Sequence, residues 1–139
     1  MHWPELPGRV REALQTLCCL AEADRPMLAR DIADQADLPA AQTAKILQLL
    51  TWAGFAKSRR GSKGGFWLVI PPERIHVKGV IEFFEPGFLN SSAPENPIER
   101  RLAQATACYR HRMATITVAD LIANRNKSER KEIAHAVRD

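Results

Sequence analysis

Three basic side chains lie within a glycine-rich stretch near the middle of this 139-residue chain. Arg59, Arg60 and Lys63 are interspersed with three glycines between residues 59 and 65. Guanidinium and ammonium groups bind phosphate oxygens, and glycines let a backbone come closer to a ligand than bulkier residues do. The pattern predicts a turn that contacts the backbone of a nucleic acid. The alternative is a solvated hairpin whose charges keep an edge strand soluble.

The residues on both sides of this turn predict two short strands. Phe55 and Ala56 precede it, and the apolar run 66–70 follows it. These residues are mostly aromatic or β-branched, and Gly54 and the pair Pro71–Pro72 bound the segment. We therefore expect a β-hairpin, called the wing below (residues 54–69), whose turn carries the three basic side chains.

The positive charge of the chain is concentrated at this hairpin. Residues 55–78 have a net charge of +5, whereas the whole chain has +4. The basic residues of the segment are Lys57, Arg59, Arg60, Lys63, Arg74 and Lys78, and its acidic residue is Glu73. Because a small overall excess is common in proteins that bind nothing charged, this local excess is the more informative quantity.

Periodicity in front of the wing predicts three helices, at 9–22, 29–35 and 40–53, with a short extended piece at 27–28 before the second. Two short helices joined by a tight turn and followed by a hairpin are typical of a winged helix-turn-helix. We expect Ala44, Leu47 and Leu50 to face the core from the third helix. Its polar face would then enter a major groove.

Gln42, Thr43 and Lys45 fall in the first turns of the third helix, which is the part that reaches base edges in helix-turn-helix proteins. Gln can pair with adenine through two hydrogen bonds, and Lys can donate to the acceptors of guanine. Each residue is also an ordinary surface residue of a helix. We predict base contacts for the three residues as a set.

Beyond the wing, the pattern predicts a fourth helix at 75–85, a proline-rich linker at 86–97 and a long helix at 98–115. The long helix carries an apolar stripe, which needs either the core of the same chain or a second copy of it. We favour a homodimer because DNA operators are commonly two-fold symmetric. The stripe consists of Ile98, Leu102, Ala105, Tyr109, Met113 and Ile116.

The expected fold is mainly α with a small β-wing. It comprises a DNA-binding domain (1–85), a linker (86–97), a dimerisation helix followed by a short helix (98–124) and a charged tail (125–139), in which a helix could follow Ser128. Thr117 and Asp120 form a capping box for the short helix. No apolar run approaches the length of a membrane span, and the N-terminus lacks the features of a signal peptide, so we expect a cytoplasmic protein without a membrane partner.

Three segments together resemble Rrf2-type transcription regulators. Residues 47–68 read Leu-x-x-Leu-x-x-Ala-Gly-Phe-x-x-Ser-x-Arg-Gly-Ser-Lys-Gly-Gly-Phe-x-Leu, residues 71–77 read Pro-Pro-Glu-x-Ile-x-Val, and residues 116–121 read Ile-Thr-Val-Ala-Asp-Leu. The resemblance implies a homodimer with two winged heads that bind double-stranded DNA. The implied DNA contacts are Arg9, Gln42, Thr43, Lys45, Ser58, Arg59, Arg60, Ser62, Lys63 and Gly64.

The chain departs from this family in its cysteines. Many members bind an iron–sulfur cluster through three cysteines in the linker and at the start of the long helix, but residues 86–97 contain none. Cys108 and His111 resemble the end of the ligand set of some members, yet a cluster normally needs four ligands. We therefore expect no cofactor and no metal. A degenerate cluster site, a metal bridge between subunits and a thiol sensor are the alternatives.

The remaining cysteines, Cys18 and Cys19, form neither a disulfide framework nor a Cys-x-x-Cys pair with Cys108. No catalytic triad, phosphate-binding loop or paired-carboxylate site is evident, so we do not expect an enzyme. The sequence predicts a sequence-specific DNA-binding transcription regulator, a repressor by preference. The alternative is a winged-helix module that binds other proteins and not DNA.

Overall fold

The computed structural model describes residues 6–90 and 93–127. Its N-terminal part is a bundle of α1 (Gly8–Glu22), α2 (Ala29–Ala36) and α3 (Ala40–Trp52), followed by the wing and by α4 (Val77–Phe84). α1 packs against α2, α3, α4 and the second wing strand, so it is the centre of this head, a term used below for α1 to α4. The three helices in front of the wing begin and end within one residue of the predicted positions.

The wing consists of the antiparallel strands β1 (Ala56–Arg59) and β2 (Gly65–Leu68), in which Ala56 pairs with Leu68 and Arg59 with Gly65. The first strand is therefore longer than predicted, and Arg59 belongs to it rather than to the turn. Met27 extends the sheet at the other edge of β2, because its N–H donates to Phe66 O at 3.0 Å and its O accepts from Phe66 N at 2.8 Å. The extended piece predicted at 27–28 is confirmed.

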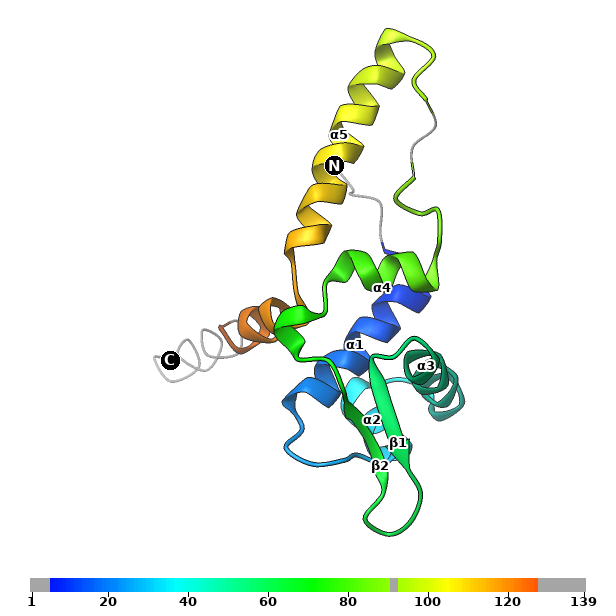
Figure 1. Cartoon of the computed structure of the whole chain (residues 1–139), viewed down its shortest axis with the longest axis vertical. Coiled ribbons are helices and arrows are strands. Elements are labelled where there is room, and N and C mark those ends of the chain that lie inside the picture. The colour runs from blue at the N-terminus through cyan, green and yellow to red at the C-terminus, as the bar shows by residue number, and fades with distance from the viewer. Residues whose placement is uncertain (1–5, 91–92, 128–139) are drawn as a thin grey trace, which may run out of the picture.

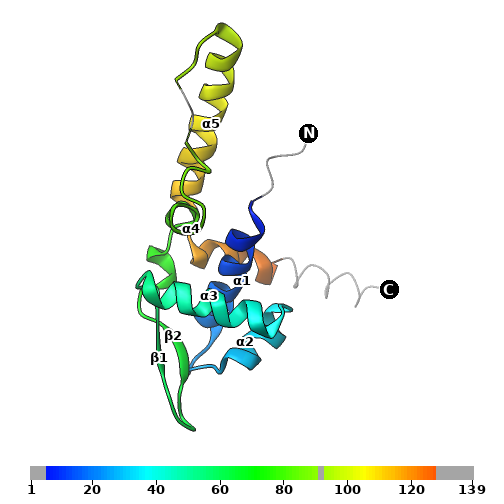
Figure 2. The ribbon, with the colours of Figure 1, turned by 90° about the vertical axis from the view of Figure 1, so that its right-hand side faces the viewer.

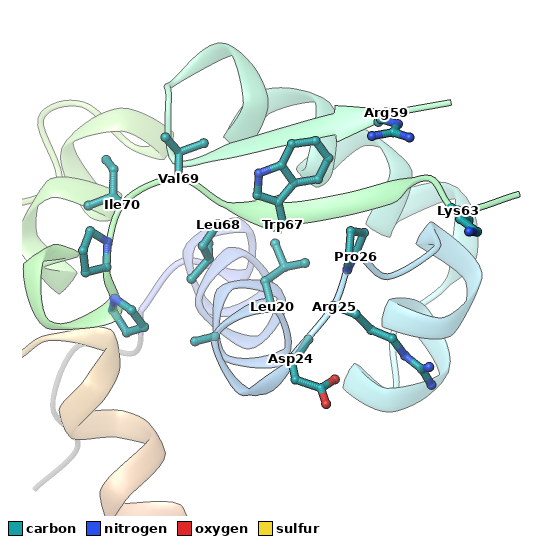
Figure 3. Close-up of a pocket in the computed structure, with 14 residues that line it drawn as sticks. Leu20, Asp24, Arg25, Pro26, Arg59, Lys63, Trp67, Leu68, Val69 and Ile70 are labelled. Carbon is teal, nitrogen blue, oxygen red and sulfur yellow. The ribbon is translucent and has the colours of Figure 1, made fainter. Parts of the chain in front are cut away.

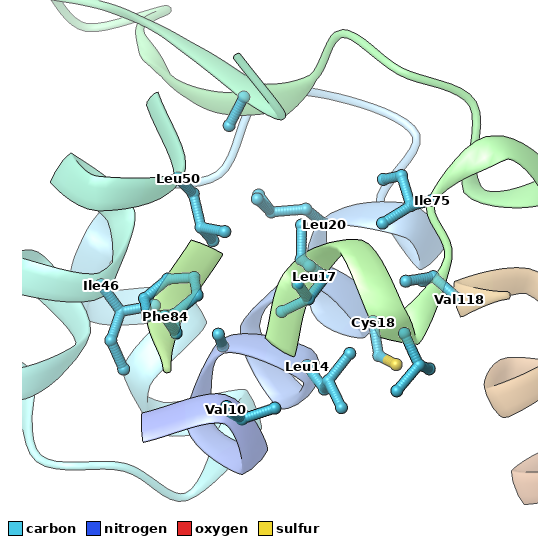
Figure 4. Packing of buried hydrophobic residues seen from close by; sticks show 14 of the residues in the cluster. Val10, Leu14, Leu17, Cys18, Leu20, Ile46, Leu50, Ile75, Phe84 and Val118 are labelled. Carbon is cyan, nitrogen blue, oxygen red and sulfur yellow. The ribbon is translucent and has the colours of Figure 1, made fainter. Parts of the chain in front are cut away.

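A single apolar core lies under the wing and between the helices. Figure 4 shows side chains of α1, α3 and α4 meeting there, with Leu17 near the centre and Ile75 and Val118 at one side. Leu17, Leu50, Ile75 and Val118 are all buried, although they are far apart in the sequence. Burial of these apolar side chains is the main force that holds the head together.

Part of the segment after α4, which we predicted to be a linker at 86–97, packs against the core. Leu89 is buried and Phe88 packs against the core cluster. Arg110 also donates a hydrogen bond from its guanidinium group to the carbonyl oxygen of Leu89. Pro86, Gly87 and the described residues beyond Leu89 are exposed, so Phe88 and Leu89 alone tie this segment to the core.

The long helix α5 (Pro97–Thr115) stands out from the head, and the wing points to the opposite end of the molecule (Figures 1 and 2). After α5 the chain returns to the head, where Val77 N donates to Ile116 O and Val118 N donates to Ile75 O, both at 2.9 Å. These two bonds join the base of α5 to the segment in front of α4. A short 3-10 turn, η1 (Pro72–Arg74), precedes that segment.

A further helix runs from 118 to 127 within the described residues. Its predicted capping box is confirmed, because Thr117 N donates to Asp120 Oδ2 at 3.0 Å and Asp120 N donates to Thr117 Oγ1 at 3.2 Å. The backbone N–H of Thr117, which donates to the carboxylate, is the main cause of the lowered pKa of Asp120. Arg125 forms an ion pair with Glu22 at the end of α1. The helix suggested after Ser128 lies outside the described residues.

Candidate nucleic-acid interface

The orientation of α3 determines which of its side chains can reach DNA. Its buried residues are Thr43, Ile46, Leu47 and Leu50, spaced by three, one and three positions as one helical face requires. Ala44, which we predicted to face the core, is exposed. Leu47 and Leu50 face the core as predicted, and Thr43 and Ile46 complete the buried face in place of Ala44.

Thr43 is fully buried, so the prediction that its side chain contacts bases is wrong. Its hydroxyl donates to the carbonyl oxygen of Pro39 at 3.0 Å, four residues earlier. This bond satisfies the polar atom inside the core, which makes a threonine tolerable there. The spacing of Thr43 from Ile46 and Leu47 was the sequence signal that could have revealed its position.

Gln42 and Lys45 are exposed on α3, as a role in base recognition requires. Gln42 is held by α1, because its Nε2 donates to Glu12 Oε2 at 2.7 Å. Arg9, at the start of α1, is also exposed. α1 and α3 pack against each other, and Figure 2 shows α3 crossing in front of α1.

The wing presents its polar side chains to solvent. Ser58, Arg59, Arg60, Ser62 and Lys63 are all exposed. Their side chains are therefore available to a phosphate backbone.

Gly64 is buried at the base of the wing turn, which corrects its assignment as a DNA contact. Its N–H donates to Gly61 O at 2.9 Å and is not free for a phosphate. A Cβ atom at this position would lie 2.1 Å from the carbonyl oxygen of Arg59. Gly64 therefore shapes the turn that presents Arg60 and Lys63.

Arg25 is a basic residue near the wing that sequence reasoning missed. It lies with Arg59 and Lys63 around a hollow of about 580 Å³ beside Trp67 (Figure 3). Asp24 is the only carboxylate among the residues that line it. The position of Arg25, directly before the extended piece that joins β2, was the available signal. The basic surface of the wing therefore continues into the loop between α1 and α2.

The apolar stripe of α5 is divided between two environments. Tyr109, Met113 and Ile116 pack against the core of the same chain. In contrast, Ile98 is 73% exposed and Leu102 is 62% exposed. Ala105 is exposed as well. The structure thus assigns the C-terminal half of the stripe to the head and leaves the N-terminal half uncovered.

The three cysteines do not fit an iron–sulfur cluster. Cys18 and Cys19 are buried in α1, and burial raises the pKa of both thiols while Arg125 opposes the rise. Cys108 and His111 are exposed on α5, well separated in the chain from the other two. Among residues 6–90 and 93–127, no three side chains of His, Cys, Asp or Glu are grouped as a metal ion would need. The cysteines and His111 therefore do not provide the four ligands that an iron–sulfur cluster normally needs.

These features define a class: two short helices joined by a tight turn and followed by a basic hairpin form a winged helix-turn-helix. The sequence also matches the model of the family described as "Rrf2: Iron-dependent Transcriptional regulator" over residues 6–124. The chain belongs to this family. Its members are transcription regulators and not enzymes, as the sequence predicted.

Solved structures with the same fold include CymR (YrzC), the global cysteine regulator of B. subtilis. It has a TM-score of 0.78 and 23% identity over 88% of this chain and 98% of that one. IscR of T. potens has a TM-score of 0.77 and 20% identity, covering 90% of each chain. At these identities the likeness shows the fold.

A curated relative, "Putative HTH-type transcriptional regulator BadM" of Rhodopseudomonas palustris, is 33% identical over 87 residues. The match covers 58% of this chain and 54% of the relative, so the chain spans about half the length of the curated relative that it matches. In the part of the chain that the structure describes, there is no helix both long enough and apolar enough to cross a membrane.

Proposed function

We propose that this protein is a homodimeric transcription repressor that binds specific sequences of double-stranded DNA in the cytoplasm. The observation that carries the proposal is the joint exposure, on one head, of Gln42 and Lys45 on α3 and of the basic side chains of the wing. A helix that reads the major groove and a hairpin that grips the flanking backbone are the two parts that a winged helix uses.

The residues of the proposed contact fall into two groups with different roles. Gln42 and Lys45 would contact base edges, which carry sequence information. The others would contact phosphates and so set the position of the head on the duplex. This second group consists of Arg9, Ser58, Arg59, Arg60, Ser62 and Lys63, to which Arg25 is now added.

The uncovered half of the α5 stripe supports the dimer. Ile98, Leu102 and Ala105 lie at spacings of four and three, so they form one apolar strip on the part of α5 that stands away from the head. A second copy of the same helix would cover this strip in an isologous contact. We keep the division into a DNA-binding domain (1–85), a linker (86–97), a dimerisation region (98–124) and a tail (125–139) as part of this proposal.

The proposal is tested by the salt dependence of DNA binding. Duplexes are first selected from a random pool by the wild-type protein, and binding to the best duplex is then measured between about 50 and 200 mM salt. Lys63→Ala should weaken binding and reduce the slope of log affinity against log salt by about 1, because one phosphate contact is lost. Arg59→Ala should do the same.

Lys78→Ala is the matched control. It removes the same charge from α4, where Lys78 lies 3.7 Å from Glu82 and away from the wing. The slope of this variant should equal that of the wild type. A folded protein that binds no duplex, or binds it without salt dependence, would contradict the proposal and favour the protein-binding alternative.

A further inference from the structure

Glu12 of α1 holds the side chain of Gln42 by a hydrogen bond. Oε2 of Glu12 accepts a hydrogen bond from Nε2 of Gln42 at 2.7 Å, across 30 positions of sequence. The bond therefore ties the helix proposed to read bases to the helix at the centre of the head.

From this contact we infer that Glu12 is a positioning residue that sets the base preference of Gln42. The inference rests on the proposed function, since it concerns the same DNA interface. Glu12 does not need to touch DNA to have this effect. It acts by determining which atoms of the Gln42 amide remain for a base.

The direction of the hydrogen bond follows from the chemistry of the two groups. An ionised carboxylate has only acceptors, so the amide must turn its NH₂ group, and not its oxygen, toward Glu12. One N–H is then used, and one N–H and the oxygen Oε1 stay free. Without Glu12, the side chain could offer both N–H groups, or rotate to offer its oxygen alone.

The atoms that remain match adenine better than guanine. In the major groove, adenine presents one acceptor, N7, and one donor, the N6 amino group, whereas guanine presents two acceptors. One free N–H and one free oxygen are the complement of adenine. Glu12 thus favours the adenine contact and disfavours the double donation that guanine would need.

Packing holds the first turns of α3 in place. Thr43, the next residue after Gln42, is fully buried and bonded to Pro39, and Ile46 and Leu47 are buried one turn later. α1 contributes Ala13, Leu14 and Leu17 to the same core. The backbones of Glu12 and Gln42 therefore both belong to packed helices. The geometry of the hydrogen bond between them is then set by the conformations of the two side chains.

The test measures base preference and not affinity alone. The duplex selected by the wild type is varied at each base pair in turn, and binding is measured by fluorescence anisotropy for wild type, Glu12→Gln and Gln42→Ala. Gln at position 12 keeps the size of the side chain but can donate as well as accept. We expect it to reduce the preference for adenine over guanine at one position by about fivefold, within the range set by a single bidentate contact.

Two controls separate this role from others. Asp34→Asn removes an exposed carboxylate from α2, and it should change the affinity for all duplexes equally. In a Gln42→Ala background, Glu12→Gln should leave every base preference unchanged, because the residue through which it acts is gone.

An unchanged preference in Glu12→Gln, with the salt-dependent binding of the wild type intact, would overturn this inference and leave the proposed function standing. Equal preferences in Gln42→Ala and wild type would overturn it as well, since Gln42 would then read no base. If the wild type selects no duplex, the proposed function itself fails, and the inference fails with it.

Discussion

Gly65 lies where β2 passes closest to the segment in front of α2. Its φ is +135°, and a Cβ atom at this position would lie 2.6 to 2.9 Å from backbone atoms of Met27. Only glycine allows both this backbone conformation and this approach. The pairing of Met27 with β2 therefore depends on the absence of a side chain at position 65.

Gly65→Ala should lower the free energy of unfolding by about 1–3 kcal/mol, because the added methyl group must either strain the backbone or separate Met27 from Phe66. Urea unfolding followed by circular dichroism measures this change. Gly79→Ala is the matched control: it lies within α4 with no atom near its added Cβ, and it should stabilise the protein by about 0.5–1 kcal/mol. Equal effects of the two changes would contradict this account of Gly65.

The three thiols should differ in reactivity. Cys108 is exposed, whereas Cys18 and Cys19 are buried. Since the thiolate is the reacting form, the raised pKa of both buried thiols further reduces their reaction with iodoacetamide. Mass spectrometry of the native protein should find Cys108 labelled first, and the other two labelled on unfolding in urea. Labelling of all three at one rate in the native protein would show that α1 is not packed as described.

The buried thiols should also make stability depend on alkaline pH. Below their ordinary pKa of 9.0, neither the folded nor the unfolded state ionises, and the contribution to stability is full. Above it, the unfolded thiols lose their protons first, so the free energy of unfolding falls as pH rises toward the higher folded pKa. Urea unfolding at pH 8 and pH 10 should show this decline. The decline should be smaller in Cys18→Ala/Cys19→Ala, and an equal decline would assign it to other groups.

At the scale of elements, α5 begins with a cap that works without support from the head. Asn96 Oδ1 accepts from Glu99 N at 2.9 Å, and Glu99 Oε2 accepts from Glu95 N at 2.7 Å. Pro97 occupies the first helical position, where its missing N–H is not needed. The first turns of α5 have no buried residue, so local bonds must hold them.

Asn96→Ala should therefore loosen the start of α5. Loss of an N-cap side chain costs about 1 kcal/mol, which corresponds to roughly fivefold faster opening of the first turn. Amide hydrogen exchange followed by NMR measures this opening for residues 99–102. Asn90→Ala, which changes an exposed asparagine outside any helix, should leave these amides unaffected. An unchanged rate in Asn96→Ala would mean that a partner, rather than the cap, holds this end.

The elements themselves were largely predictable, but their orientations were not. The helices in front of the wing follow from the spacing of apolar residues and from breaks such as Pro7–Gly8, which act within one turn of chain. The face of α3 was misassigned because Thr43 and Ala44 are both small, and burial of Thr43 depends on a bond to Pro39 that composition does not reveal. The length of β1 was missed because pairing with Gly65, and not local preference, carries the strand to Arg59.

At the scale of the whole molecule, the uncovered N-terminal half of the α5 stripe is the proposed surface of the dimer. Leu102→Glu should convert the proposed dimer into a folded monomer, because Leu102 is exposed in the single chain and would be buried only between two copies. Its melting temperature should fall only by the stabilisation that dimerisation provides, and should no longer depend on protein concentration. Sedimentation equilibrium measures the mass. Gln104→Glu, which adds the same charge to an exposed position off the stripe, should remain dimeric. A wild type that is monomeric at all concentrations would contradict the dimer.

Met113→Glu should behave differently from Leu102→Glu, although both residues belong to the same stripe. Met113 is partly buried against the core of its own chain, so a carboxylate there should destabilise the fold by about 1–2 kcal/mol. Thermal unfolding of the two variants side by side measures this contrast. Equal melting temperatures would show that the base of α5 is not docked on the head.

The sequence by itself determined the class of this protein: local periodicity, turn residues and the charge of the wing are properties of neighbouring residues, and they suffice for a winged helix-turn-helix. The resemblance of three motifs to known regulators indicated the Rrf2 family. Only the tertiary structure decided which residues of that plan face outward. Thr43 and Gly64 are buried, Leu89 packs in the core, and the apolar stripe of α5 is divided between the head and solvent. Arg25 and Lys63 line the same hollow, and Glu12 forms a hydrogen bond with Gln42. The docking of Leu89, the division of the stripe and the bond between Glu12 and Gln42 depend on contacts between residues far apart in the chain, which no local pattern contains.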